Sequence, residues 1–232
     1  MRAALIVGNT DGIGLALTRQ LLDRGFSVTG VSKSPSTIAH EAYRHCVLNV
    51  SDARYRELLA AALPTDRLDL CVYCAGIGEL FSIDNMALDV STFDVNLMGL
   101  IRTAEVVLPR LAAADVGVFA GLSSLADLMP IPEAPAYAAS KAGMTSYLEG
   151  LAPAMAKRRV AVVNVRLGFV DTRMAKAARK PFVISPDEAA RRILRSLTSD
   201  RPPSRLNIPR RAAFIMGVLA PLVRFASRFK RG

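Results

Sequence analysis

Hydrophobic residues along this chain follow two alternating patterns from residue 3 to about residue 200. Runs that are apolar at successive positions predict strands buried on both faces, whereas apolar residues spaced three or four apart predict helices with one buried side. The expected strands cover residues 3–7, 26–31, 46–50, 68–75, 116–122, 160–167 and 206–208. The expected helices cover residues 13–24, 51–62, 88–113, 136–157 and 187–198.

The alternation of strands and helices predicts a parallel sheet with helices on both faces, because parallel strands need crossover connections that helices supply. With 232 residues and 51% hydrophobic composition, the chain can bury one sizeable core. We therefore expect an α/β fold with a doubly wound parallel sheet of about seven strands in a single domain. Residues 1–200 would form this domain, and residues 201–232 a basic, partly apolar C-terminal extension that packs on it or contacts a membrane or a subunit.

Three cysteines, no Trp and no N-terminal signal pattern favour a reducing, cytoplasmic location. Cys71 and Cys74 have CxxC spacing, but they fall in an expected strand, where residues three apart point to opposite faces. We therefore expect neither a disulfide nor a metal site from this pair.

The excess of positive charge is concentrated at the C-terminal end of the chain. Residues 201–232 contain eight basic residues and no acidic one, around an uncharged apolar stretch at 212–223. As a helix this stretch would span about 18 Å, too short to cross a hydrocarbon core of about 30 Å. It could cap the core or a subunit interface, or lie on a membrane surface with its flanking basic residues on lipid phosphates. Nucleic acid is not expected as a partner, because no DNA-reading motif accompanies the charge.

Tyr137 and Lys141 lie four residues apart in an expected helix, and Ser124 lies thirteen residues upstream of Tyr137. Positions i and i+4 share one helix face, so the ammonium group of Lys141 can lie beside the ring of Tyr137. Lowering the pKa of a phenol from about 10 to about 7 requires roughly 4 kcal/mol, which a nearby cation in a partly desolvated cleft can largely supply. The spacing predicts an acid-base pair, with Ser124 as a hydrogen-bonding partner of a substrate oxygen.

Three glycines occupy the turn between the first expected strand and the first expected helix. Glycines in this position let the pyrophosphate of a dinucleotide approach backbone amides at a helix N-terminus. The turn therefore predicts dinucleotide binding by residues Gly8, Asn9, Thr10, Asp11, Gly12, Ile13 and Gly14.

The residues after the second expected strand bear on which dinucleotide binds. NAD-binding folds usually place an acidic residue there to hold the ribose hydroxyls, whereas this chain has Ser32 and Lys33. An ammonium and a hydroxyl would attract the 2′-phosphate of NADP. We expect NADP to be preferred, with NAD as the alternative; Asp11 in the glycine turn does not add to this preference.

The sequence resembles the short-chain dehydrogenase/reductase family of the short, single-domain type, over roughly residues 1 to 200. The resemblance rests on the glycine turn, Ser124, Tyr137 and Lys141, which occur in that order. The glycines match its TGxxxGxG pattern, with Val7 in place of Thr. Asn96 matches the catalytic asparagine of the family. The NNAG element of the family is matched only by Ala75 and Gly76, because Tyr73 and Cys74 replace both asparagines, and Leu167 replaces the proline of its PG-containing loop.

The resemblance implies a seven-stranded Rossmann fold and reversible hydride transfer between NAD(P) and a carbonyl or alcohol. Tyr137 would act as general acid and base and Ser124 would orient the substrate oxygen. Lys141 would keep Tyr137 acidic and touch the nicotinamide ribose, while Asn96 would order a water on the proton path. Beyond the glycine turn, the implied cofactor contacts are Ser32, Lys33, Asn49, Val50, Cys74, Ala75, Gly76, Asn96, Tyr137, Lys141, Gly168, Val170 and Thr172.

The family also implies where a substrate lies: between the loops after the fourth to sixth strands and a lid at residues 172–186. The residues expected to wall this space are apolar, so we expect a hydrophobic substrate: Leu125, Met129, Ile131, Phe169, Met174 and Phe182. The lid also carries basic residues that could attract an anionic substrate tail, or meet the cofactor phosphate or water: Arg173, Lys176, Arg179 and Lys180. The two long helices correspond to those that pair subunits in the family, which implies a homodimer or homotetramer.

Two other interpretations of the sequence stay open. The chain could be a dinucleotide-binding sensor or scaffold without turnover, as the missing NNAG asparagines would allow. It could also be a peripheral membrane adaptor in which the basic C-terminal segment is the active part. The filled positions Asn96, Ser124, Tyr137 and Lys141 favour an enzyme over both.

Overall fold

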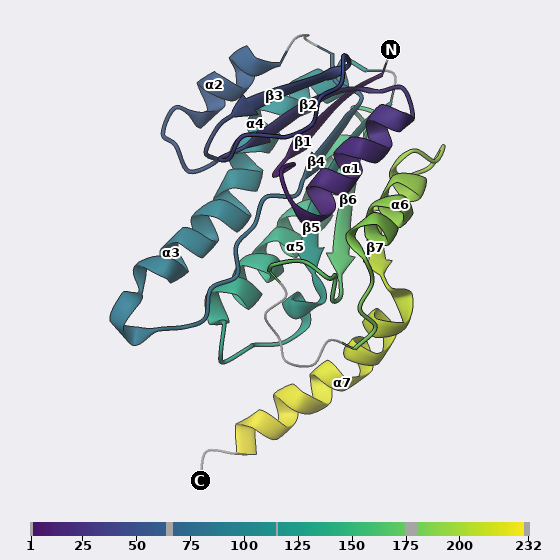
Figure 1. Cartoon of the computed structure of the whole chain (residues 1–232). Helices are drawn as coiled ribbons and strands as arrows, with labels where there is room; N and C mark the ends of the chain where they lie inside the picture. The colour runs from purple at the N-terminus through teal and green to yellow at the C-terminus, as the bar shows by residue number, and fades with distance from the viewer. Residues whose placement is uncertain (1, 64–66, 115, 175–180, 230–232) are drawn as a thin grey trace.

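A computed structural model describes residues 2–63, 67–114, 116–174 and 181–229, with the side chains of residues 220–229 left out. Seven parallel strands form one sheet in the order β3-β2-β1-β4-β5-β6-β7 (Figure 1). The strands are β1 (Ala3–Val7), β2 (Ser27–Ser32), β3 (Tyr43–Val47), β4 (Leu70–Tyr73), β5 (Gly117–Ser124), β6 (Val160–Leu167) and β7 (Arg205–Ile208). The predicted α/β fold with a doubly wound sheet of seven strands is confirmed.

Helices cover both faces of the sheet. On one face lie α1 (Gly12–Asp23) and α6 (Pro186–Leu197), which pack side by side in Figure 1. On the other face lie α2 (Tyr55–Ala62), α4 (Gly99–Ala112) and α5 (Pro135–Ala156). The helix α3 (Ala87–Phe93) precedes α4, and short 3₁₀ turns occupy Ile83–Asn85 and Leu125–Leu128.

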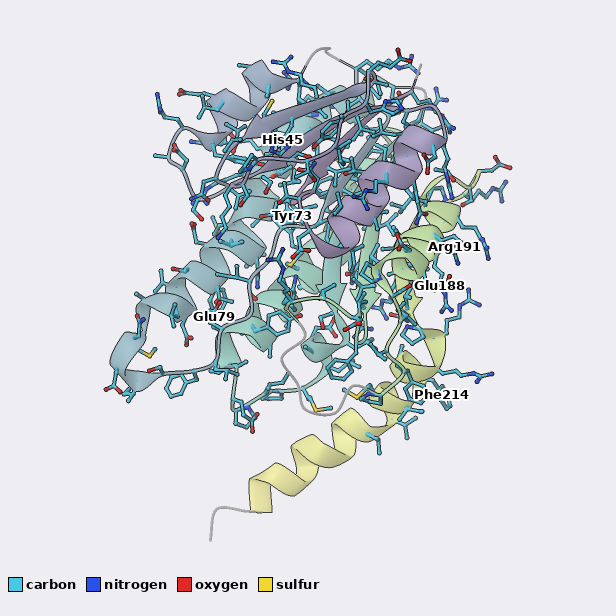
Figure 2. All side chains as sticks on the ribbon, viewed as in Figure 1. His45, Tyr73, Glu79, Glu188, Arg191 and Phe214 are labelled. Atoms are coloured by element: carbon cyan, nitrogen blue, oxygen red, sulfur yellow. The ribbon has the colours of Figure 1, made fainter. Side chains whose placement is uncertain are left out.

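Two hydrophobic clusters explain why the strands are apolar at successive positions. In β1, Ala4 and Ile6 pack toward α1 and α6, whereas Leu5 and Val7 pack toward α2, α4 and α5. All four side chains are buried. Because such a strand contributes side chains to a core on each face of the sheet, its sequence is a continuous apolar run. A sheet with one solvent-exposed face would instead show alternating apolar and polar residues. Figure 2 shows Tyr73, one of the largest fully buried side chains, at the end of β4.

Most element bounds match the sequence-based expectation, and β3 is the main exception. It was expected at residues 46–50, but it covers Tyr43–Val47 at the edge of the sheet. None of its residues is fully buried, and Arg44 and Val47, which point to opposite faces, are both exposed. The strand therefore lacks the continuous apolar run that marks the central strands. The prediction extended the strand to Val50 because Val50 is apolar. Val50 in fact belongs to the following turn, from which its side chain packs into the core.

A π-helical turn at Asp94–Met98 interrupts the long helix that was expected over residues 88–113. Periodicity does not distinguish such a turn from regular helix, since both keep apolar residues on one side. Turns of this kind often occur at functional sites. Asn96 lies in the middle of this one.

The C-terminal helix α7 (Arg210–Phe229) starts directly after β7 and runs away from the sheet (Figure 1). The seventh strand therefore lies within residues 201–232, which were expected as an extension. Within the described part of the chain, no helix has both the length and the apolar composition that a membrane span requires.

Candidate active site

Ser124, Tyr137 and Lys141 meet at the carboxyl edge of the sheet. Ser124 is the last residue of β5, and Tyr137 and Lys141 lie on successive turns of α5. The hydroxyls of Ser124 and Tyr137 share a hydrogen bond, and the Nζ atom of Lys141 lies 5.9 Å from the centre of the Tyr137 ring. Ser124 is half-buried, whereas its neighbour Ser123 is buried and bonded to the Lys141 carbonyl, so the alternation of the strand selects Ser124.

Burial has the largest effect on the pKa values of Tyr137 and Lys141. It raises the pKa of Tyr137, an effect that the hydrogen bond from Ser124 opposes and the charge of Asp127 reinforces. It also lowers the pKa of Lys141 to about 8. The predicted lowering of the tyrosine pKa is therefore wrong for this geometry. The main reason is burial, because a phenolate removed from water is costly. The ammonium group of Lys141 donates to the Leu122 carbonyl at 2.8 Å.

Asn96 connects the loop after β4 to α5. Its side-chain oxygen accepts from the Ile77 amide at 2.8 Å, and its nitrogen donates to the Ile77 carbonyl and the Ser140 hydroxyl, each at 2.9 Å. Ser140 in turn donates to the Tyr137 carbonyl at 2.9 Å. Asn96 is fully buried, so these bonds satisfy a polar group that would be costly to leave unpaired. The π-helical turn thus places Asn96 within the same site as Tyr137.

The loop after β4 passes directly over this site. A side chain at Gly76 would meet Asn96 Oδ1 at 3.2 Å and Lys141 Nζ at 3.6 Å, and one at Gly78 would meet the Tyr137 ring at 3.3 Å. Cys74 and Ala75, the preceding residues, are partly buried. The expected cofactor contacts at residues 74–76 therefore lie beside the candidate catalytic groups.

The glycine turn before α1 requires glycines for steric reasons. Gly8 has a φ of +84°, and a Cβ atom there would lie 2.6 Å from the Ala75 amide nitrogen. A Cβ at Gly14 would lie 2.0 Å from the Gly8 carbonyl oxygen. These contacts pack β1, α1 and the β4 loop closely, which brings the backbone amides of the turn to the crevice. This cradle fits a dinucleotide pyrophosphate.

Other residues of the turn make contacts within the protein. Asn9 is buried and donates to the Tyr43 hydroxyl at 2.5 Å, and the Thr10 and Ser32 hydroxyls lie 2.9 Å apart. Ile13, in the first turn of α1, is partly buried and packs on the core. The bond from Thr10 to Ser32 ties the glycine turn to the end of β2, where Lys33 follows and is exposed.

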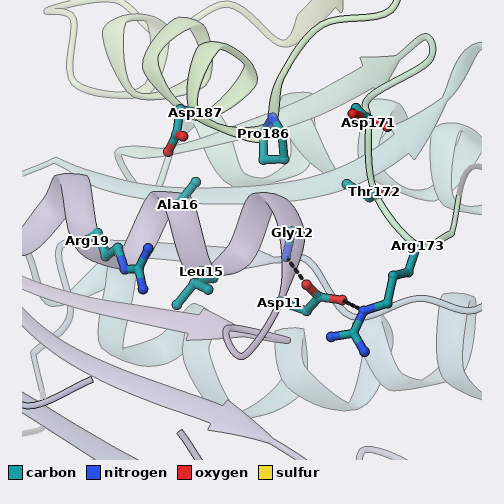
Figure 3. A pocket seen from close by; sticks show the side chains of 10 residues that line it. All are labelled: Asp11, Gly12, Leu15, Ala16, Arg19, Asp171, Thr172, Arg173, Pro186 and Asp187. Atoms are coloured by element: carbon teal, nitrogen blue, oxygen red, sulfur yellow. Dashed lines mark hydrogen bonds and ion pairs between the residues drawn. The ribbon is translucent and has the colours of Figure 1, made fainter. Parts of the chain in front are cut away.

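Asp11 caps α1 and holds the segment after β6. Its carboxylate accepts from the Gly12 amide at 2.8 Å and from Arg173 Nε at 2.8 Å, as Figure 3 shows. The bond from Arg173 lowers the pKa of Asp11. A Cβ at Gly12 would lie 3.1 Å from Thr172 Cγ2, so Thr172 lies directly against the glycine turn. The cavity beside it, of about 520 Å³, runs between α1 and the start of α6 (Figure 3).

The remaining expected residues fall on loops at the same edge. Val170 is buried and bridges to Ile184, while Gly168 is partly buried beside Leu125. Asn49 is exposed and its side chain accepts from the Ser51 amide at 3.1 Å. Among the expected wall and lid residues, Met174 lies against Gly76, whereas Lys176, Arg179 and Lys180 fall outside the described residues.

A cluster of polar and charged residues behind the site was not predicted from the sequence. Asp127 and Arg166 form a buried ion pair, and Thr145 donates to Asp127 at 2.6 Å. Ser123 lies 2.8 Å from the Thr145 hydroxyl. These residues come from the 3₁₀ turn after β5, from β6 and from α5. A signal existed in the sequence, because Arg166 lies inside a strand whose other residues, apart from Asn164, are apolar, and a charge there needs a buried partner.

Comparison with known proteins identifies the family of this chain. A family model described as short chain dehydrogenase matches residues 2–181. The chain is 28% identical over 236 residues to the 3-oxoacyl-[acyl-carrier-protein] reductase FabG of Vibrio harveyi, covering 94% of this chain and 89% of that protein. It is 26% identical over 196 residues to a very-long-chain 3-oxoacyl-CoA reductase of Anas platyrhynchos, covering 77% of this chain but only 63% of that relative's length.

Solved structures agree on the fold. A short chain dehydrogenase from Burkholderia cenocepacia J2315 in complex with NADP superposes with a TM-score of 0.83 at 22% identity, covering 95% of this chain and 94% of that one. At this identity the likeness concerns the fold alone. The family model, however, matches well over half of the sequence, and the chain therefore belongs to the short-chain dehydrogenase family of oxidoreductases.

Proposed function

We propose that this protein catalyses reversible hydride transfer between a nicotinamide dinucleotide and a carbonyl or alcohol substrate, with Tyr137 as general acid and base. The observation that supports this most directly is the convergence of Ser124, Tyr137 and Lys141 under the loop at Gly76. A sensor without turnover would have no chemical need for the three groups together.

In the reducing direction, the Tyr137 hydroxyl gives its proton to the substrate oxygen as charge develops there. Ser124 shares a hydrogen bond with that hydroxyl, so a substrate oxygen that lies between them is held by two donors. Donors fixed in place before the reaction stabilise developing negative charge without reorganising. In the oxidising direction the Tyr137 phenolate takes the proton from the alcohol oxygen, and Ser124 remains a hydrogen-bonding partner of that oxygen.

Lys141 and Asn96 support Tyr137 in different ways. With a pKa of about 8, Lys141 carries a positive charge at neutral pH. We propose that this charge offsets part of the burial cost of the phenolate that forms when Tyr137 loses its proton. Asn96 acts through Ser140, which fixes the first turns of α5 at the Tyr137 carbonyl. Both are proposed to keep the tyrosine oriented at the edge of the crevice.

A bound nicotinamide cofactor supplies or accepts the hydride. The glycine turn would hold its pyrophosphate, Gly76 and Thr172 would border its nicotinamide half, and Asn49 and Val50 its adenine half. We propose that NADP is preferred, because the exposed Lys33 follows β2 beside the bonded pair of Ser32 and Thr10. A cation at this position would attract a 2′-phosphate.

A hydrophobic carbonyl compound is the proposed substrate class. Met174 lies over the loop at Gly76 and Gly78, and Phe182 further along the same segment is 49% exposed. Two relatives are named as reductases of 3-oxoacyl thioesters, which carry apolar chains. We propose further that the protein acts as a homo-oligomer paired through α4 and α5, and that it works in the cytoplasm.

Tyr137→Phe tests the proposal against Tyr147→Phe, a matched change ten residues along the same helix. NADPH and NADH oxidation would be screened against ketones, aldehydes, quinones and acyl thioesters. Loss of the proton donor should reduce turnover by about 10²–10⁴-fold while cofactor binding stays nearly intact. The Tyr147 variant should keep its activity. Turnover of Tyr137→Phe within a few-fold of the unaltered protein would refute the assigned acid.

A further inference from the structure

The outer side of α7 exposes large apolar side chains to solvent. Phe214, Ile215, Val218 and Leu219 are 74%, 40%, 55% and 45% exposed, respectively. Their positions i, i+1, i+4 and i+5 place them on one side of the helix. Figure 2 shows Phe214 near the start of α7, and Figure 1 shows the helix leading away from the sheet. A stripe of this kind on a helix that leaves the domain needs a partner.

The stripe continues onto the segment before α6. Phe182 and Val183 are 49% and 47% exposed, and a groove of about 390 Å³ is lined by Phe182, Arg210, Arg211, Phe214 and Ile215. Phe182 has a φ of +57°, a conformation that non-glycine residues rarely adopt. We call the stripe on α7 together with Phe182 and Val183 the α7 surface.

Charge decides which partner fits the α7 surface. Arg210 and Arg211 are exposed at its edge, and α7 contains Arg224 and Arg228 but no acidic residue. Apolar side chains beside arginines, without acids, complement a bilayer whose headgroups are negatively charged. A second copy of α7 is a poor partner, because the arginines of two such helices would repel each other.

The first turn of α7 places this surface near the candidate active site. Ala212 is buried, and a Cβ at Gly168 would lie 3.7 Å from its Cβ. The same Gly168 borders Leu125, the residue after Ser124. The α7 surface is therefore anchored on the loops that border Ser124, and contact there would turn this edge of the sheet toward the lipid.

We propose that the α7 surface docks this protein onto anionic lipid bilayers, lying in the interface without crossing it. The proposal does not depend on hydride transfer, so its failure would leave the proposed chemistry untouched. It does connect the two, since docking would present the candidate site to substrates dissolved in the bilayer.

Flotation of the full chain with phosphatidylcholine vesicles, with and without phosphatidylglycerol, tests this proposal. We expect binding to the anionic vesicles only. Val218→Asp should weaken that binding by at least about tenfold, because it places a charge in the apolar interface. Val116→Asp is the matched control. Val116 is 54% exposed and precedes β5, so it lies at the amino ends of the strands, opposite the candidate site. Its binding should equal that of the unaltered protein.

A fluorescent reporter gives a second readout. The chain contains no Trp, so Phe214→Trp introduces a single one at the most exposed position of the stripe. Its emission should shift to the blue with anionic vesicles and be quenched by brominated lipids. Three results would each overturn the proposal. The first is unchanged emission, and the second is flotation that Val218→Asp leaves intact. The third is that the unaltered protein binds no vesicles while Val218→Asp breaks up an oligomer.

Discussion

Asp127 and Arg166 form a bidentate ion pair directly behind Ser124. The side chains are 2% and 8% exposed, and Arg166 Nε donates to Asp127 at 2.7 Å. Asp127 lies in the 3₁₀ turn that starts after Ser124, and Arg166 lies opposite Ser123 on β6. Thr145 on α5 donates to the same carboxylate. The pair thus joins the end of β5, β6 and α5, the three elements around Ser124 and Tyr137.

Asp127→Asn should destabilise the protein by about 3–5 kcal/mol, because it keeps the shape of the side chain but leaves the charge of Arg166 buried and unpaired. Urea unfolding at neutral pH would measure the loss. Glu105→Gln is the control, since Glu105 pairs with Arg56 while both side chains are more than half exposed, and it should cost less than about 1 kcal/mol. Equal losses in the two variants would contradict a structural role for the buried pair.

The fold follows closely from the sequence because each central strand is buried on both faces. Ala3–Val7 and Val160–Leu167 have the expected bounds, since their apolar runs end at polar or glycine residues. The edge strand β3 was displaced by three residues at each end, because its burial depends on its neighbours rather than on its own composition. The π-helical turn at Asn96 was also missed, because it leaves the hydrophobic spacing unchanged.

Gly8→Ala should be much more destabilising than Gly25→Ala, although both glycines have similar positive φ values of +84° and +74°. A Cβ at Gly25 meets no atom within 4 Å, so that variant reports backbone strain alone, about 1–2 kcal/mol. At Gly8 the Cβ meets the Ala75 backbone, which adds roughly 1–3 kcal/mol of overpacking. Urea unfolding of both variants gives the difference. Equal costs would mean that the turn has room that the structure does not show.

The candidate site was predictable where chemistry and spacing coincide, and less so where contacts come from distant segments. Ser124, Tyr137 and Lys141 stand out in the sequence because strand alternation and helical spacing place them together. The link from Arg173 to Asp11 joins residues 162 positions apart, and no local pattern predicts it. The pKa of Tyr137 was misjudged because the sequence does not reveal how completely the side chain is desolvated or that Asp127 lies close enough to raise the pKa further.

Lys141→Met should change how stability depends on pH. In the folded protein the pKa of Lys141 is about 8, below the 10.5 of a solvated lysine, so the unfolded chain binds more protons above pH 8. The penalty for burying the charged amine is present below pH 8 and is relieved as the pH rises. Between pH 7 and pH 9 the unaltered protein should therefore gain about 1 kcal/mol relative to the variant.

Urea unfolding of both proteins at the two pH values would measure this difference. Cys71 and Cys74 also titrate in the unfolded chain near pH 9, but they are common to both proteins and cancel in the comparison. A constant difference between the two proteins across this range would show that Lys141 is not held in a desolvated position.

Lys33→Glu should reverse the proposed cofactor preference. The change places a carboxylate at the end of β2, where it would repel the 2′-phosphate of NADP and accept hydrogen bonds from the ribose hydroxyls of NAD. We expect the Kd for NADPH to rise at least about tenfold and that for NADH to stay equal or fall. Arg24→Glu changes the net charge equally at the far end of α1, so it separates the local effect from the field of the whole protein. If both variants weakened NADPH binding to the same extent, Lys33 would have no specific contact with the phosphate, and the preference would have to arise elsewhere in the glycine turn.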